Sequence, residues 1–158
     1  MASLPDYAEL HCLSNFSFLR GASHPEELVS RAHALGYKAL ALTDECSLAG
    51  AVRAHQEARD CGLPLILGAE ILVEGLKLVL LATDRRSYGA ISSLITTGRR
   101  RSKKGAYSLK LSDVESLSGS GALMLWIPGE DPAPAAWIAE RFHRHAWIAA
   151  ELHCGPND

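Results

Sequence analysis

The sequence of 158 residues lacks several features that would place it in a particular class of protein. It has no run of about 18 apolar residues, so no part of it is expected to span a membrane. Its net charge is −2, which excludes a domain that binds nucleic acid through an overall positive charge. The first ten residues contain no basic stretch followed by a long apolar stretch, so we expect no secretory signal and a cytoplasmic location.

Paired cysteines and sequence repeats are also missing. The four cysteines include no C-x-x-C pair, and we expect reduced thiols, as is usual in the cytoplasm. The tetrapeptide ELHC occurs twice, at residues 9–12 and 151–154, but two matches of this length do not establish a repeat. What remains is an ordinary composition, with 47% hydrophobic and 22% charged residues, and a length that suits one domain with its own core.

The pattern of residues 7–50 predicts a strand, a helix and a second strand. Residues 7–13 are short and mostly apolar, as expected of a buried strand. A helix is expected to begin at Ser23, which precedes a proline and two glutamates, and to end at Gly36. Residues 38–43, KALALT, then predict the second strand.

The remainder of the chain alternates between apolar strands and helices. The expected strands are residues 63–73, 76–83, 122–127 and 146–152, and the expected helices are residues 48–61, 84–97, 111–117 and 135–144. This alternation predicts an α/β fold, a distorted β/α barrel with mainly parallel strands. Six strands are too few for a closed eight-stranded barrel, so we expect a single domain over residues 1–158 that stops before the barrel closes.

Three side chains that can bind a metal are expected at strand ends of this barrel. His11, Asp44 and Glu70 belong to three different strands, and catalytic groups collect at the C-terminal strand ends of β/α barrels. Imidazole and carboxylate ligands suit zinc, manganese or iron. The structural alternative has His11 hydrogen-bonded in the barrel mouth, Asp44 capping the next helix and Glu70 in solvent. The residues alone leave both interpretations open.

Residues 99–105, RRRSKKG, form the one dense basic run. A loop whose charges are solvated explains it most simply. The functional interpretation is a loop that contacts the phosphates of a nucleic acid, because clustered basic side chains release counterions on binding. The side chains that would make these contacts are Arg99, Arg100, Arg101, Lys103 and Lys104.

Three phrases of the sequence resemble the start of the polymerase and histidinol phosphatase (PHP) domain: LHCLSNFSFLRGA, LGYKALALTDECSLAG and LPLILGAEI. The chain is most similar to the PHP domain at the N-terminus of bacterial C-family DNA polymerases, and among these to the error-prone group. The resemblance covers essentially the whole chain. It implies a distorted β/α barrel whose rim of His, Asp, Glu and Cys residues can bind metals and hydrolyse phosphoesters.

The resemblance also implies a set of metal ligands, of which this chain keeps only part. The ligand positions that match are His11, Asp44 and Glu70. The second histidine of the family's opening His-x-His is Leu13, the histidine that follows the aspartate is Glu45, and a later histidine is Lys77. The remaining ligands of the family would lie after residue 158.

These departures predict that metal chemistry has been lost. A phosphoesterase that uses two or three metals needs ligands that hold the ions about 3.5–4 Å apart, and Lys77 places a positive charge where a cation would sit. We therefore expect no catalytic residue and no firmly bound cofactor. Zinc or manganese would bind weakly at most, through His11, Asp44 and Glu70, with Glu45 as a weaker ligand.

The resulting interpretation is a structural PHP portion of an error-prone, damage-tolerant DNA polymerase that acts in DNA replication and repair synthesis. Its partners would be the remainder of the polymerase chain and, through it, DNA, with no membrane involved. The isolated chain is expected to self-associate through unpaired sheet edges. The alternative is an active metal-dependent phosphoesterase or 3′–5′ exonuclease, in which Glu45 replaces an imidazole ligand.

Overall fold

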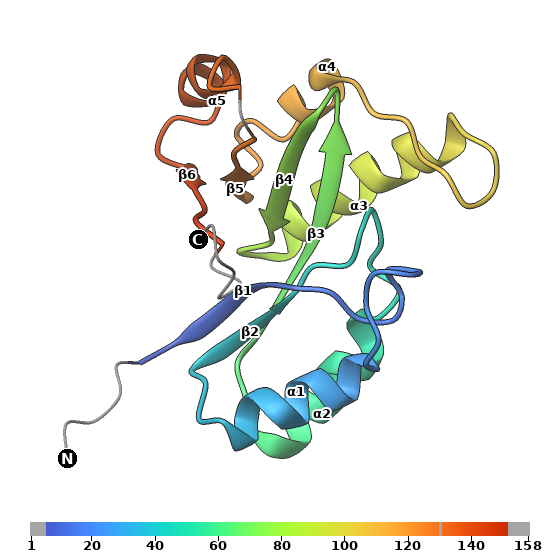
Figure 1. Cartoon of the computed structure of the whole chain (residues 1–158), viewed down its shortest axis with the longest axis vertical. Coiled ribbons are helices and arrows are strands. Elements are labelled where there is room, and N and C mark those ends of the chain that lie inside the picture. Colours follow the sequence, from blue (N-terminus) through green and yellow to red (C-terminus); the bar gives the residue numbers. More distant parts are fainter. Residues whose placement is uncertain (1–5, 130, 152–158) are drawn as a thin grey trace.

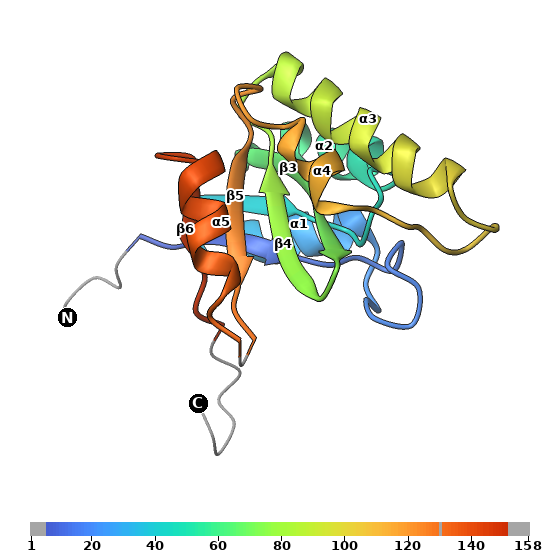
Figure 2. The same ribbon diagram turned by 90° about the horizontal axis from the view of Figure 1, so that it is seen from above.

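The computed structural model describes residues 6–129 and 131–151, which form one curved sheet with helices on its outer face (Figures 1 and 2). The strands are β1 (Ala8–Cys12), β2 (Ala39–Leu42), β3 (Leu65–Val73), β4 (Leu76–Leu81), β5 (Leu123–Ile127) and β6 (Ala146–Ile148). The helices are α1 (Pro25–Ala34), α2 (Ala51–Cys61), α3 (Arg85–Arg100), α4 (Leu111–Glu115) and α5 (Pro134–Arg141).

The six strands lie in the sheet in the order in which they occur along the chain. β1, β2 and β3 are parallel, β4 is antiparallel to β3 and to β5, and β6 is parallel to β5. Every strand except β4 therefore points the same way. β3 and β4 are joined by Glu74 and Gly75, which both have positive φ, as a tight two-residue hairpin requires. The result is the expected α/β barrel-like fold, present here as an open half-barrel.

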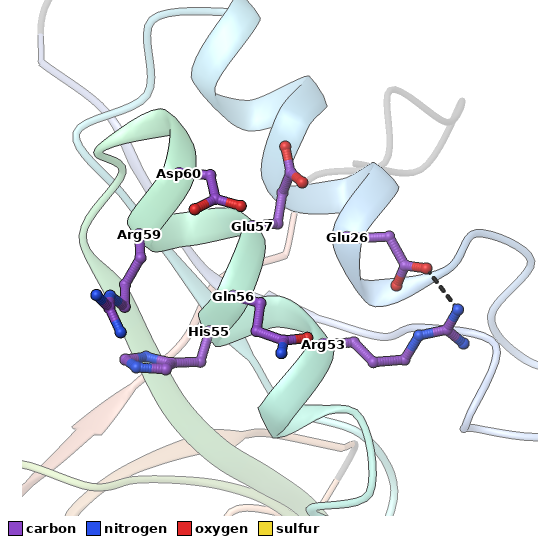
Figure 3. Close-up of a pocket in the computed structure, with 7 residues that line it drawn as sticks. All are labelled: Glu26, Arg53, His55, Gln56, Glu57, Arg59 and Asp60. Atoms are coloured by element: carbon purple, nitrogen blue, oxygen red, sulfur yellow. Dashed lines mark ion pairs between the residues drawn. The ribbon is translucent and has the colours of Figure 1, made fainter.

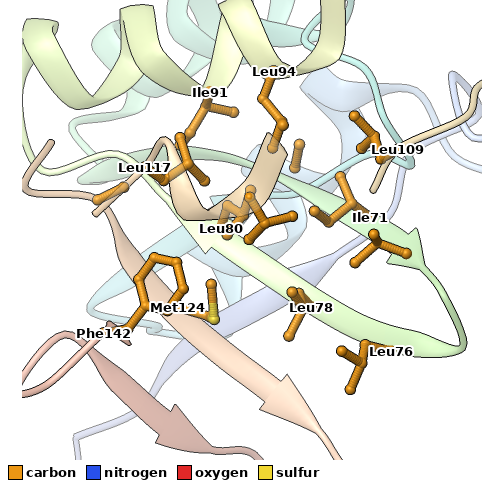
Figure 4. Close-up of a cluster of buried hydrophobic side chains, with 14 of the residues drawn as sticks. Ile71, Leu76, Leu78, Leu80, Ile91, Leu94, Leu109, Leu117, Met124 and Phe142 are labelled. Atoms are coloured by element: carbon orange, nitrogen blue, oxygen red, sulfur yellow. The ribbon is translucent and has the colours of Figure 1, made fainter. Parts of the chain in front are cut away.

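Two apolar cores lie between the sheet and its helices. The larger core packs the outward-facing residues of β3, β4 and β5 against α3, α4 and α5, and it includes Ile71, Leu78 and Leu80, all at most 1% exposed (Figure 4). The smaller core joins β2 to α1 and α2, and Val29 is its most deeply buried residue on α1. Because side chains alternate across a strand, the residues between these core positions face the inside of the half-barrel.

The inner face of the half-barrel has little apolar filling. A small cluster of buried residues lies there, made of Ala41, Val79 and Leu81. Beside it is a hollow of about 520 Å³, lined by residues 7–11 of the first strand, by residues 149–151 and by inward-facing residues of β4 and β5. The inside of the half-barrel is therefore open next to His11, which is one of its lining residues.

Most predicted elements are confirmed, and several boundaries differ. The second helix, expected from residue 48, starts at Ala51 with Gly50 as its N-cap. The third helix, expected to end at residue 97, continues through Gly98 to Arg100. A glycine is tolerated there because Leu109 packs against it, with side-chain atoms 3.0 Å from where a Cβ would lie.

Two further boundaries that differ are the start of α1 and the end of β6. The N-cap of α1 is His24 rather than Ser23, and the Glu27 carboxylate accepts the backbone N–H of His24 at 2.8 Å. β6 ends at Ile148, so the expected strand over residues 146–152 is shorter, and residue 152 lies outside the described part.

Two negative expectations can be compared with the described residues. The cysteines within them, at positions 12, 46 and 61, are free thiols, whereas Cys154 lies outside the described part. No helix in residues 6–129 and 131–151 is long and apolar enough to cross a membrane.

Candidate functional site

The topology brings several charged side chains to one end of the half-barrel. His11 lies near the C-terminal end of β1, and Glu45 follows β2, where its backbone pairs with that of Glu70 on β3. β4 is antiparallel, so Lys77, near its N-terminal end, lies at the same end of the sheet. Together with Arg20 and Glu151, which reach this end from a loop and from the end of the described chain, these residues form what we call the rim cluster.

Glu70 is the centre of the rim cluster. Its side chain is 3% exposed, and its Oε2 lies 2.8 Å from His11 Nε2 and 3.5 Å from Lys77 Nζ. Burial alone would raise the pKa of Glu70, but hydrogen bonds from His11 and Arg20 and the charge of Lys77 outweigh it and lower the pKa to about 2. Glu70 is therefore a buried, ionised carboxylate that neighbouring cationic side chains stabilise.

His11 lies between two carboxylates. Its Nε2 contacts Glu70, and its Nδ1 contacts Glu151. Burial lowers the pKa of His11, but the hydrogen bonds and charges of the two glutamates outweigh it, so the pKa is raised. An imidazole with both nitrogens engaged in this way has no lone pair left for a metal ion.

Arg20 links two of the rim carboxylates. Its Nη1 contacts Glu70 Oε1 and lies 2.8 Å from Glu45 Oε2, while its Nη2 donates to Glu70 Oε2 at 3.0 Å. The guanidinium therefore makes a two-pronged contact with Glu70 and bridges it to Glu45. This geometry is the one in which arginine pairs most strongly with carboxylates.

Asp44 directly precedes Glu45 of the rim cluster and organises the loop that carries Arg20. It is 1% exposed, its Oδ1 accepts the Ser14 N–H at 2.8 Å and the Ser17 hydroxyl at 2.7 Å, and its Oδ2 accepts the Ser14 hydroxyl at 2.7 Å. The loop is also closed at Gly21, where a Cβ would lie 1.9 Å from the Ser14 carbonyl oxygen. Asp44 thus holds the loop and does not cap the following helix.

The basic run divides into two groups. Arg99 points inward, where its guanidinium donates to the carbonyl oxygens of Glu45 and Cys46 and lies 5.4 Å from the centre of the Tyr107 ring. Arg101 forms an ion pair with Asp113. Within the described part of the chain, the side chains of Arg100, Lys103 and Lys104 form no ion pair and no side-chain hydrogen bond, whereas Arg99 contacts backbone carbonyls and Arg101 pairs with Asp113. Contact with nucleic acid stays a prediction for all five basic residues, of which Arg99 and Arg101 also have intramolecular partners.

A second hollow lies away from the rim, on the outer surface of α1 and α2. It has a volume of about 590 Å³ and is lined by charged and polar side chains of both helices (Figure 3). Its one ion pair joins Glu26 to Arg53 at 2.7 Å, with half of the Arg53 side chain exposed (Figure 3). Because Arg53 is half exposed and pairs with a single glutamate, this hollow provides control variants for the rim cluster.

Comparison with known proteins places the chain in a family. The model of the PHP domain matches residues 9–124. The chain belongs to the PHP family. The error-prone DNA polymerase of Dechloromonas aromatica is 61% identical over 163 residues, which cover 99% of this chain and 16% of that protein. The corresponding protein of Aromatoleum aromaticum is 55% identical, with coverage of 96% and 15%. The chain thus spans about one sixth of the length of these relatives.

Solved structures agree with the family in fold. A protein from Bifidobacterium adolescentis, named as a candidate metal-dependent phosphoesterase, has a TM-score of 0.63 at 19% identity, covering 80% of this chain and 68% of that one. An amidohydrolase from Chromobacterium violaceum has a TM-score of 0.59 at 17% identity, with coverage of 89% and 75%. At this level of identity the likeness concerns the fold alone.

The PHP ligand positions of this chain do not suit a metal ion in the arrangement observed. The oxygens of Asp44 are taken up by two serines, and those of Glu70 by Arg20 and His11. Among residues 6–129 and 131–151, no three His, Cys, Asp or Glu side chains are grouped so as to hold an ion. His11 and Glu70 lie together at the rim, with Glu45 beside them, whereas Asp44 serves the loop; weak metal binding by these residues stays a prediction.

Two residues of the rim cluster were not anticipated from the sequence. Arg20 lies in a loop, and its partners are 25 and 50 positions away. Glu151 belongs to the second ELHC tetrapeptide, contacts His11 and lies 3.6 Å from Lys77. No signal in the sequence pointed to Arg20, because its contacts join a loop to distant strands.

Proposed function

We propose that this chain is the PHP module of an error-prone DNA polymerase and that it supports the longer polymerase structurally, without hydrolysing phosphoesters itself. The relatives with 55–61% identity carry that name, and the chain corresponds to 15–16% of their length. Nucleotide transfer, and with it contact with DNA during replication and repair synthesis, would belong to the remainder of the polymerase. That remainder would be the main partner of this module.

The observation that carries this proposal is the pairing of Glu70 with Arg20 and Lys77. Metal-dependent phosphoester hydrolysis needs a bound cation that polarises the phosphoryl oxygen and activates a water. At this rim the carboxylate that matches a family ligand already has two cationic side chains beside it. A metal ion would have to displace an arginine from a two-pronged contact and approach a lysine, which is unfavourable.

The test is an assay of hydrolysis with p-nitrophenyl phosphate and with single-stranded DNA, in the presence of manganese. We expect rates that cannot be distinguished from those of buffer alone, because the carboxylates are occupied. Activity that disappears in an Asp44→Asn, Glu70→Gln double variant, and persists in the surface control Glu26→Gln, would contradict the structural role and support the hydrolase alternative.

Self-association of the isolated chain stays a prediction. β1 and β6 are the edge strands of the sheet, and on β6 the side chains of Trp147 and Ile148 are 50% and 69% exposed. Exposed edges of this kind favour pairing with another strand. In a longer polymerase, the remainder of the chain is the partner that this proposal expects at such surfaces.

A further inference from the structure

We propose that Arg20 is a built-in replacement for a metal ion: its guanidinium supplies, at the rim of the half-barrel, the positive charge that holds Glu45 and Glu70 together. This inference deepens the proposed structural role and rests on it. It concerns a residue that matches none of the family's ligand positions.

The charges of the rim cluster require such a cation. Three carboxylates converge there, those of Glu45, Glu70 and Glu151, and the permanently charged groups beside them are Arg20 and Lys77. Without Arg20, Lys77 would be the only permanently charged cation in the cluster, and it lies 3.5 Å or more from its two partners. Like charges at short range in a partly buried site repel one another strongly unless a cation lies between them.

The position of the guanidinium is that of a bridging ion. Its Nη1 contacts one oxygen of Glu70 and one of Glu45, which come from different strand ends. Glu45 is held from its other side as well, because its Oε1 accepts the Tyr107 hydroxyl at 3.0 Å. A divalent cation holds together carboxylates that would otherwise repel one another. The single cationic nitrogen of Arg20 between two carboxylates has the same effect.

The loop is built so that Arg20 arrives at this position. Ser17 connects three parts of it: its hydroxyl donates to Asp44, accepts the backbone N–H of Glu45 at 2.9 Å, and its carbonyl oxygen accepts the backbone N–H of Arg20 at 3.0 Å. The backbone of Arg20 is thus fixed to the same buried aspartate that precedes Glu45. A cation tethered in this way needs no exchange with solvent ions and remains in place when the protein is stripped of metals.

The experiment compares thermal unfolding of the unaltered chain, Arg20→Ala and Arg20→Lys, with and without millimolar manganese chloride, against sodium chloride of equal ionic strength. Arg20→Ala should melt about 5 °C lower without manganese, and manganese should recover at least about half of that loss. The unaltered chain and Arg20→Lys should not respond to manganese, because both keep a cation at position 20, between Glu45 and Glu70. Should Arg20→Ala fail to fold, Arg20→Gln keeps the side-chain length without the charge and is expected to show the same response.

Arg53→Ala is the matched control, since it removes an exposed arginine from a single glutamate (Figure 3). The proposal would be contradicted if the melting temperature fell no further in Arg20→Ala than in Arg53→Ala. A lower melting temperature of Arg20→Ala that manganese does not raise would also contradict it. The carboxylates would then need the shape of the guanidinium and not its charge. Phosphoester hydrolysis by the unaltered chain would contradict the proposed structural role, whereas the melting temperatures test the role of Arg20. The two proposals can therefore fail separately.

Discussion

Replacing Asp44 by alanine is expected to lower the free energy of unfolding by about 4 kcal/mol, because three buried donors would lose their acceptor at once. These donors are the Ser14 N–H and the hydroxyls of Ser14 and Ser17, at 2.7–2.8 Å. The loop that they order also carries Arg20, so the rim cluster would loosen as well. Urea unfolding followed by circular dichroism measures the change.

The matched control for this variant is Asp84→Ala. Asp84 also accepts a backbone N–H and a hydroxyl, both from Ser87, but at the start of α3 where solvent can replace it. The free energy of unfolding should fall clearly less in Asp84→Ala than in Asp44→Ala. Equal losses in the two variants would mean that burial of Asp44 contributes nothing and that the loop does not depend on it.

Glu70→Ala is expected to cost about 3 kcal/mol of unfolding free energy, since it leaves several positively charged groups without their central carboxylate. Arg20 is 36% exposed, so water would solvate its guanidinium in part once Glu70 is removed. We therefore expect a smaller free-energy cost than the upper range for fully buried ion pairs. His11 and Lys77 would lose the same partner. The measurement is again urea unfolding, with the slope of the transition checked for constancy.

Glu26→Ala provides the comparison for Glu70→Ala, because Glu26 also pairs with an arginine but at the surface (Figure 3). An exposed pair of this kind contributes about 1 kcal/mol or less. If Glu70→Ala were as mild as Glu26→Ala, the rim cluster would have no stabilising role, and its ion pairs would be incidental.

The order of elements was predictable because it is recorded in local patterns. The alternation of Leu76, Leu78 and Leu80 with inward-facing residues defines β4, and Glu74-Gly75 defines the hairpin that precedes it. Boundaries were less predictable where packing overrides local preference. Gly98 has the residue type that ends helices, but Leu109, eleven positions later, packs on it and allows α3 to continue.

The site was predictable only in part, for a similar reason. The resemblance to the PHP family pointed to His11, Asp44 and Glu70, and each of them does lie at or beside the rim. The sequence did not indicate that the serines at positions 14 and 17 would occupy Asp44, nor that Arg20 would reach Glu70. Such contacts join a loop to distant strands and leave no periodic signature, so only the three-dimensional arrangement reveals them.

The central claim, that the rim is closed by the protein's own cations, is tested most directly by elemental analysis of the unaltered chain purified without added ions and dialysed. We expect far less than one equivalent of zinc, manganese or iron per chain, because Arg20 and Lys77 already neutralise the carboxylates that would bind it. One full equivalent of zinc or manganese, retained through dialysis and lost in His11→Ala, would contradict that claim.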